Sequence, residues 1–267
     1  MNLSDLRENK PIKLLCIGDT GTGKTGSLAS LAKAGYNLRI LDFDNGLESL
    51  AGQLKAFPEA LARVKYETLM DPLKTIGTGN SMKIVPVGEP RAFGKALGLL
   101  DKWAPPTASE DLGSPSTWGT DTILVVDSGT FMSLAALRRV MSMAQRSGEN
   151  PQIQDWGMAM QNIEDTFTIL YSDTIKCHVI VTFHIVYIEQ PDKSNKGYPS
   201  TLGNKLPPKI GRWFNQVFFY KSLSNGKKTI YTQSTSDIDA KCPIPGIPKE
   251  LSLESGLAEF FAAASKL

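Results

Sequence analysis

Thiols and imidazoles are scarce in this 267-residue chain, which contains three cysteines and two histidines. Cys16, Cys177 and Cys242 lie far apart, and no two of them have the spacing of a metal-ligand pair. Two of the three fall in apolar, strand-like segments, so we expect reduced thiols of the kind found in the cytosol. A histidine-rich metal site is excluded, because only His178 and His184 are present.

The chain also lacks a long hydrophobic run. Its longest apolar stretch, HVIVTFHIVYI at 178–188, is too short and too polar to span a bilayer. The first residues, MNLSDLRENKP, contain no apolar segment typical of a signal peptide. We therefore expect a cytoplasmic protein with no membrane partner. With 41% hydrophobic and 21% charged residues, the composition is that of an ordinary globular protein.

Acidic residues are under-represented in one part of the chain. Residues 185–250 contain ten Lys or Arg and five Asp or Glu, a net charge of +5 in a chain whose overall charge is +2. Such an imbalance fits an anionic partner near the C-terminal part, and it equally fits a surface of solvated lysines.

Segments typical of strands alternate with segments typical of helices, which predicts an α/β fold with a mostly parallel central sheet flanked by helices. Strands are expected at 12–18, 37–44, 64–69, 121–128 and 176–185, and helices at 23–35, 90–103, 129–145 and 156–170. Residues 104–120 and 187–209 are expected to be loops. Residues 214–223 and 227–235 flank Asn225-Gly226 and predict a C-terminal β-hairpin. Residues 252–265 predict a final amphipathic helix, and the whole chain, 1–267, is expected to form one domain.

The segment GDTGTGKT at 18–25 fits the phosphate-binding pattern G-x-x-x-x-G-K-[ST] between a predicted strand and a predicted helix. Average residue frequencies give about 0.01 chance matches in a chain of this length. The motif predicts backbone N–H groups that bind phosphates, with Lys24 on the β- and γ-phosphates and Thr25 on Mg²⁺. The residues expected to bind the nucleotide are Gly18, Asp19, Thr20, Gly21, Thr22, Gly23, Lys24, Thr25 and Gly26.

A second apolar strand ends in LVVDSGT at 124–130, and Asp127 is expected to hold the magnesium ion or its water. Many ATPases carry a catalytic glutamate directly after this aspartate, but this chain has Ser128. A guanine-reading N-K-x-D motif is also missing, because NKLP at 204–207 lacks the aspartate. These features favour ATP over GTP and leave the catalytic carboxylate to be found elsewhere.

The strand that follows the phosphate loop ends in LDFDNG at 41–46, which brings two carboxylates to the same sheet edge. Strand alternation predicts that Asp42 and Asp44 share a face, and Asp44 lies nearer the crevice between neighbouring strands. We therefore expect Asp44 to orient the attacking water. The alternative is an acidic strand end that precedes an Asn-Gly turn.

GDTGTGKT, LVVDS and ILDFDNGL together resemble the RecA-like recombinase ATPases, in particular the short phage-encoded RecA-like proteins of recombination and single-strand annealing. The resemblance covers most of residues 11–242, the expected RecA-like core, and leaves about 250–267 as a helical extension. It implies that Asp44 stands where the family has its catalytic glutamate, with a shorter arm. It also implies that His184, at the end of VTFHI, senses the γ-phosphate. The alternative is a histidine at a strand end whose hydrogen bonds are purely structural.

RecA-like ATPases bind ATP between subunits, and the resemblance implies that Lys241 in DAKCP (239–243) reaches a neighbour's γ-phosphate. The family pattern has a second basic residue where this chain has Pro243, and an ordinary surface lysine is the alternative.

The resemblance places two DNA-binding loops at about 146–156 and 186–208, the first before DWGMAMQ (155–161). Phosphate contacts would come from Lys193, Lys196, Lys205 and Lys209, and stacking faces from Tyr187 and Tyr198. A polar loop without such a role has the same composition.

The resemblance implies a DNA-stimulated ATPase that uses ATP and Mg²⁺ on single-stranded DNA in phage-type recombination, annealing or replication, within a host cytoplasm. Its expected partners are single-stranded DNA, further copies of the chain, and replication or single-strand-binding proteins. Two alternatives share the core: a ring-forming helicase or packaging motor, and a nucleotide-switched binding module with little hydrolysis.

Overall fold

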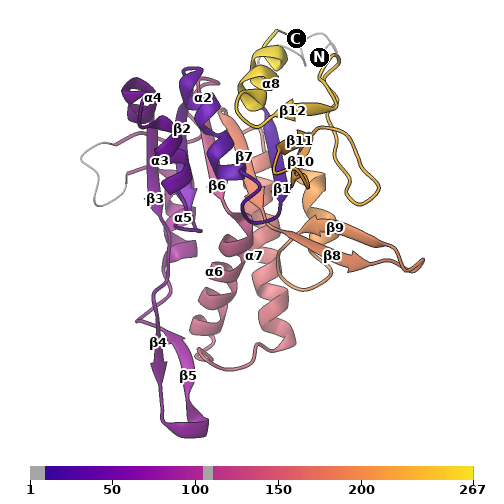
Figure 1. Ribbon diagram of the computed structural model, residues 1–267. Helices are drawn as coiled ribbons and strands as arrows, with labels where there is room; N and C mark the ends of the chain where they lie inside the picture. Colours follow the sequence, from indigo (N-terminus) through magenta and orange to yellow (C-terminus); the bar gives the residue numbers. More distant parts are fainter. Residues whose placement is uncertain (1–9, 105–110, 267) are drawn as a thin grey trace.

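An eight-stranded mixed sheet forms the centre of the computed structural model, which describes residues 10–104 and 111–266 (Figure 1). The strand order is β12-β11-β10-β1-β7-β6-β2-β3. Its strands are β1 (Lys13–Gly18), β2 (Asn37–Asp42), β3 (Val64–Thr68), β6 (Thr122–Asp127), β7 (His178–Phe183), β10 (Gln216–Ser222), β11 (Lys228–Tyr231) and β12 (Glu250–Ser252). Every pair from β10 to β3 is parallel, and the pairs of β11 with β10 and β12 are antiparallel. The predicted fold class, including the C-terminal hairpin, is confirmed.

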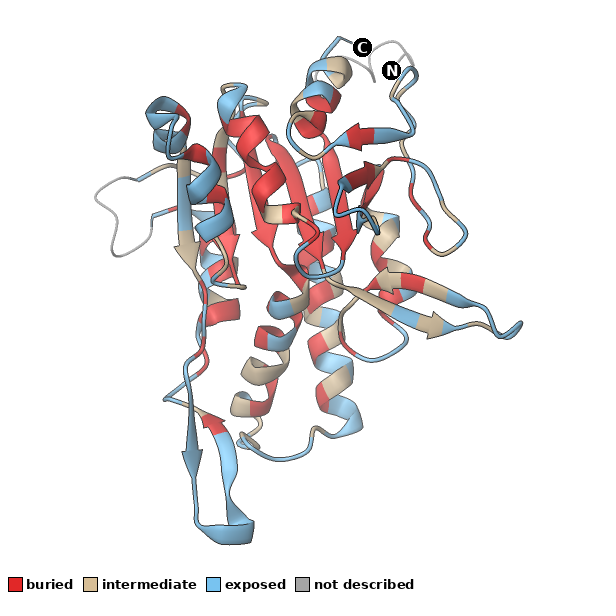
Figure 2. Cartoon of the chain, in the orientation of Figure 1, coloured by how far each residue is buried: buried red, intermediate tan, exposed pale blue. Residues whose placement is uncertain are grey.

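Alternation along the strands divides the buried side chains between two faces of the sheet. In β1, Leu14 and Cys16 pack into one cluster, and Leu15 and Ile17 pack into the other. The first face is covered by α2 (Ala29–Lys33), α3 (Glu48–Leu54), α4 (Pro58–Ala62) and α8 (Gly256–Ala264). The second is covered by α5 (Ala92–Asp101), α6 (Gly129–Met143) and α7 (Ile153–Tyr171). The result is a three-layer arrangement whose red central strands in Figure 2 are buried on both faces.

Most predicted elements lie where the sequence placed them, but some boundaries differ. The helix expected at 23–35 is divided at Leu28 into α1 (Lys24–Ser27) and α2. The strand expected to reach residue 44 ends at Asp42. The last helix begins at Gly256 rather than 252, because Glu250–Ser252 pairs with β11 as an edge strand.

The prediction that 187–209 is a loop was wrong. This segment contains most of an antiparallel hairpin, β8 (Ile185–Glu189) with β9 (Asn195–Pro199), and the start of a 3₁₀ helix, η3 (Pro207–Trp213). The hairpin is held by tertiary contacts that its local sequence does not reveal. The Gly197 N–H donates to the Asp237 carbonyl oxygen at 2.7 Å, and a Cβ on Gly197 would lie 2.6 Å from Ile185 and 2.7 Å from Ile238.

A second hairpin, β4 (Leu73–Ile76) with β5 (Lys83–Pro86), was not predicted and projects from the sheet (Figure 1). Its turn contains a short 3₁₀ helix, η2 (Gly79–Ser81). Both faces of this hairpin are largely exposed (Figure 2), but Val85 is buried. A Cβ on Gly148 would lie 2.7 Å from the Val85 side chain. None of the helices in the described part of the chain is long and apolar enough to cross a membrane.

Candidate functional site

The loop between β1 and α1 contains three glycines, and at each of them a side chain would clash or be strained. A Cβ on Gly18 would lie 2.5 Å from the Tyr220 carbonyl oxygen. Gly21 has a φ of 77° and Gly23 a φ of 94°, in the left-handed region that side chains disfavour. These conformations allow successive backbone N–H groups to turn toward a bound anion at the start of α1.

Lys24 folds back over this loop. Its ammonium donates to the carbonyl oxygens of Gly18 at 2.8 Å and Asp19 at 2.9 Å. Burial lowers the pKa of Lys24, and the carboxylates of Asp127 and Asp44 oppose that shift. The lysine therefore stands between the phosphate loop and two carboxylates, where a phosphate group could replace its carbonyl partners.

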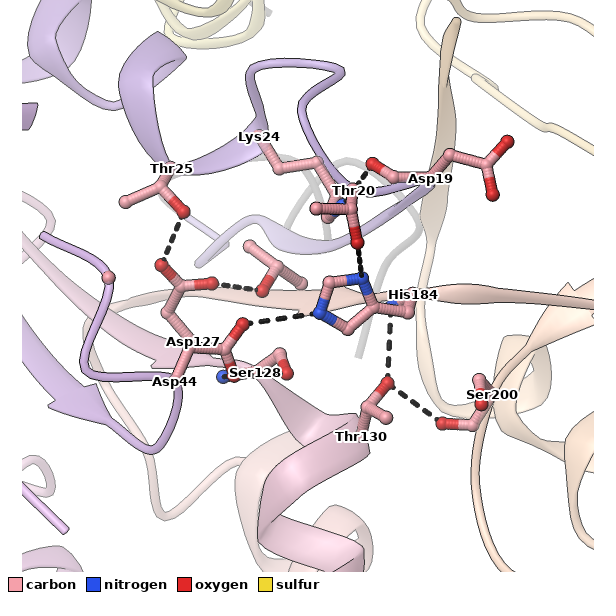
Figure 3. Close-up of polar contacts among 12 residues, drawn as sticks. Asp19, Thr20, Lys24, Thr25, Asp44, Asp127, Ser128, Thr130, His184 and Ser200 are labelled. Atoms are coloured by element: carbon pink, nitrogen blue, oxygen red, sulfur yellow. Dashed lines mark hydrogen bonds and ion pairs between the residues drawn. The ribbon is translucent and has the colours of Figure 1, made fainter. Parts of the chain in front are cut away.

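Asp127 ends β6 and is joined to the phosphate loop through Thr25. The Thr25 hydroxyl donates to Asp127 Oδ2 at 2.7 Å (Figure 3). The Thr182 hydroxyl donates to Asp127 Oδ1. Thr182 belongs to β7, which lies between β1 and β6 in the sheet. Burial raises the pKa of Asp127. A carboxylate and a hydroxyl this close together fit Mg²⁺, which prefers oxygen ligands and would favour the charged form of Asp127.

Ser128 is bonded twice to the carboxylate of Asp44. Asp44 Oδ1 accepts from the Ser128 hydroxyl at 2.6 Å and from the Ser128 backbone N–H at 3.0 Å. Burial alone would raise the pKa of Asp44, but the hydrogen bonds from His184 and Ser128 outweigh burial and hold that pKa below its usual range. Asp44 is therefore a charged, oriented carboxylate beside the Asp127 strand end.

Asp42 and Asp44 have different partners, because β2 ends at Asp42 and strand alternation does not continue to Asp44. Asp42 accepts from the Thr68 hydroxyl at 3.1 Å and from the Gly46 N–H at 3.4 Å. Burial raises the pKa of Asp42. Asp42 therefore ties the end of β2 to β3, and only Asp44 contacts the end of β6 through its side chain.

His184 connects Asp44 with the phosphate loop, and Figure 3 shows its ring between them. Its Nε2 lies 3.3 Å from Asp44 Oδ2, and its Nδ1 lies 3.4 Å from the Thr20 hydroxyl. The His184 backbone N–H donates to the Thr130 hydroxyl at 3.1 Å, which donates to the Ser200 carbonyl oxygen at 2.9 Å. One residue thus joins the phosphate loop, the carboxylate and the base of the β8–β9 hairpin.

The sequence did not identify the supporting roles of Ser128, Thr130 and Thr182. In the sequence, Ser128 was notable only because it occupies the position where many ATPases have a catalytic glutamate. The one available signal for Thr182 was its position two residues before His184 in VTFHI, on the same side of β7 by alternation.

Lys241 lies on the surface beside η3 rather than within this network. Its ammonium donates to the Gly211 carbonyl oxygen at 3.2 Å, and its backbone pairs with Val217 of β10. Its action on a neighbouring subunit remains a prediction.

The residues predicted to contact DNA differ in their surroundings. Lys196 pairs with Asp239 at 2.6 Å, and Lys209 pairs with Glu164 at 3.1 Å. Lys193 and Lys205 are exposed. Val186 is the strand partner of Tyr198, so Tyr187, the next residue, points to the opposite face of the hairpin from Tyr198. The two tyrosines therefore cannot form one stacking surface.

Residues 10–244 match a family model described as an AAA domain. The chain belongs to this AAA-domain family. Family membership indicates a nucleotide-binding ATPase of the P-loop type, in agreement with the loop at 18–25. No curated protein matches the chain.

Proposed function

We propose that this AAA-domain protein hydrolyses ATP and acts on single-stranded DNA as a homo-oligomer, in phage-type recombination, annealing or replication. The family match supports the ATPase class. The RecA-like motifs support the finer role.

Each side chain of the site has a role in this proposal. The phosphate loop and Lys24 bind the phosphates, and Thr25 and Asp127 hold Mg²⁺, which would neutralise phosphate charge. Asp44 accepts a hydrogen bond from the attacking water and orients it. His184 responds to the presence of the γ-phosphate through its contact with Thr20. Thr130 transmits a change in the position of His184 to the β8–β9 hairpin.

The observation that carries the proposal is the double hydrogen bond from Ser128 to Asp44. We expect Asp44→Asn to bind ATP normally and to hydrolyse it roughly 100-fold more slowly, because the amide is a poor acceptor for the proton of water. Asp42→Asn is the matched control and should retain turnover within a few-fold, since Asn can still accept from Thr68 and Gly46. Steady-state phosphate release and fluorescent-nucleotide binding measure both effects, and wild-type turnover by Asp44→Asn would disprove the role of Asp44.

Lys24→Ala should abolish hydrolysis, because no other described ammonium donates to the loop carbonyls of Gly18 and Asp19. Unchanged phosphate release by Lys24→Ala would contradict the whole assignment.

The DNA role is tested by ATPase rates with and without single-stranded DNA. We expect stimulation, and we expect Lys193→Ala with Lys205→Ala to weaken DNA binding because these lysines are exposed. A rate that does not respond to DNA would favour the nucleotide-switched binding module, to which the ion pairs of Lys196 and Lys209 already give support. Electron microscopy showing closed rings would favour the helicase or motor.

A further inference from the structure

A cavity of about 410 Å³ lies at the opposite edge of the sheet from the phosphate loop. It is lined by Ile12, His178 and Gln216, at the amino ends of β1, β7 and β10. The phosphate loop follows the carboxyl end of β1, so the two places lie at opposite ends of the same strand. The proposed ATPase chemistry uses none of the residues that line this cavity.

Three aromatic rings form one wall of the cavity. Tyr36 lies edge-on to Phe261 with ring centroids 5.5 Å apart, and His178 lies edge-on to Phe261 at 5.1 Å. His178 Nδ1 accepts from the Ile12 N–H at 2.8 Å, and its other ring nitrogen is bonded to the Thr120 backbone. Burial lowers the pKa of His178 to about 4, so at neutral pH this ring is uncharged. The wall is therefore aromatic and uncharged.

Gln216 supplies an unused acceptor in the same wall. Its side chain lines the cavity and is 6% exposed, and among the described residues its Oε1 has no hydrogen-bond partner. A buried acceptor without a donor is unfavourable, and the terminal amide torsion of glutamine is broad enough to turn this oxygen toward a ligand.

The charge of the lining has one sign. Lys10 and Lys266 stand at the cavity, and the described lining residues include no Asp or Glu. An anionic group would meet the ammonium groups of Lys10 and Lys266 there, and no described lining residue carries a carboxylate that would repel it.

We propose that this cavity binds a planar aromatic or heteroaromatic anion that carries an N–H or O–H donor. The ring would lie against Tyr36 and the edge of His178, which Phe261 supports from the buried side. The donor would reach Gln216 Oε1, and the anionic group would face Lys10 and Lys266. The volume falls within the range of small-molecule sites, roughly 300–1,000 Å³. Binding at this cavity does not depend on ATP hydrolysis.

The probe for this test is 8-anilino-1-naphthalenesulfonate, which has planar rings, an N–H donor and a sulfonate. Its uncharged relative N-phenyl-1-naphthylamine keeps the rings and the N–H but lacks the anion. Fluorescence titration of the full chain with saturating Mg-ATP should show one site. This site should bind the sulfonate at least three to five times more tightly than the uncharged relative. That ratio of affinities is the one expected for exposed ion pairs.

Ala264 lines the cavity and Ala262, on the same helix, is exposed, so the two offer a matched pair of variants. Ala264→Phe should fill the cavity and abolish probe binding, and Ala262→Phe should leave it unchanged. Lys10→Ala with Lys266→Ala should remove the preference for the sulfonate, and Gln216→Leu should weaken both probes. Circular dichroism confirms that each variant is folded.

Four results would overturn the proposal. Probe binding could survive Ala264→Phe, or the two probes could bind equally well. ATP could displace the probe, which would place the probe in the nucleotide site. Binding could also be seen only in a variant lacking residues 1–9, which would make the cavity a seat for the chain's own N-terminal segment.

Discussion

At the scale of single residues, Ser128 shows how one substitution moves a function to a neighbouring strand. A glutamate after Asp127 would supply its own carboxylate, but a serine carries no charge and here acts as a hydrogen-bond donor. Both donors of Ser128 point at Asp44, which lies just beyond the end of the adjacent strand β2. The carboxylate and the residue that positions it therefore come from different strands.

Ser128→Ala should lower the turnover number for ATP roughly tenfold and leave the KM nearly unchanged, because Asp44 keeps the backbone donor but loses the hydroxyl. The lost hydrogen bond also raises the pKa of Asp44. Because turnover needs the charged carboxylate, the turnover of Ser128→Ala should begin to fall at a higher pH than that of the wild type as the solution is made more acidic. A pH–rate profile separates this effect from a general loss of structure.

Ser133→Ala is the control for this variant, since its hydroxyl bonds to the Gly129 carbonyl oxygen and to Thr201, away from Asp44. A pH–rate profile of Ser128→Ala that coincides with the wild type would remove Ser128 from any positioning role.

At the scale of elements, the start of α6 is fixed by a close approach between Gly129 and the ring of Phe183 in β7. A Cβ on Gly129 would lie 2.3 Å from that ring. Gly129→Ala should therefore reduce the free energy of unfolding by about 1–3 kcal/mol, because the helix or the ring must move. Urea unfolding followed by circular dichroism measures the change.

The same substitution at Gly98 should have the opposite sign. Gly98 lies inside α5 and is exposed, and a Cβ there would meet nothing within 4 Å. Gly98→Ala should stabilise the protein by about 0.5–1 kcal/mol through the lower backbone entropy of the unfolded chain. Equal effects at the two glycines would show that the contact with Phe183 does not constrain α6.

Elements with strong local patterns could be predicted, and elements held by distant contacts could not. The apolar runs of β1, β6 and β7 and the Asn225-Gly226 turn carry their own signals. The β8–β9 hairpin depends on Ile238, some forty residues further along the chain. Within the site, strand ends predicted Asp127 and Asp44, but the bonds of Ser128 and Thr182 follow from a strand order that a single sequence does not reveal.

At the scale of the whole molecule, buried groups at the two ends of the central strands respond to acid in opposite ways. Near the phosphate loop, burial raises the pKa values of Asp42 and Asp127, so these groups take up protons in the folded protein before they do so in the unfolded chain. At the other end, burial lowers the pKa of His178 from 6.5 to about 4. The unfolded chain then binds the proton first.

The stability of the whole protein should therefore fall below pH 6.5 because of His178. Its contribution is fully present above pH 6.5 and is lost as the pH falls toward about 4, since only the unfolded chain gains a proton in that window. Between pH 7.5 and 5 this single group should remove roughly 2 kcal/mol from the free energy of unfolding. His178→Gln offers the Ile12 N–H an acceptor and does not titrate. Urea unfolding at several pH values should give a flatter curve for that variant, and two parallel curves would show that His178 is not the group responsible.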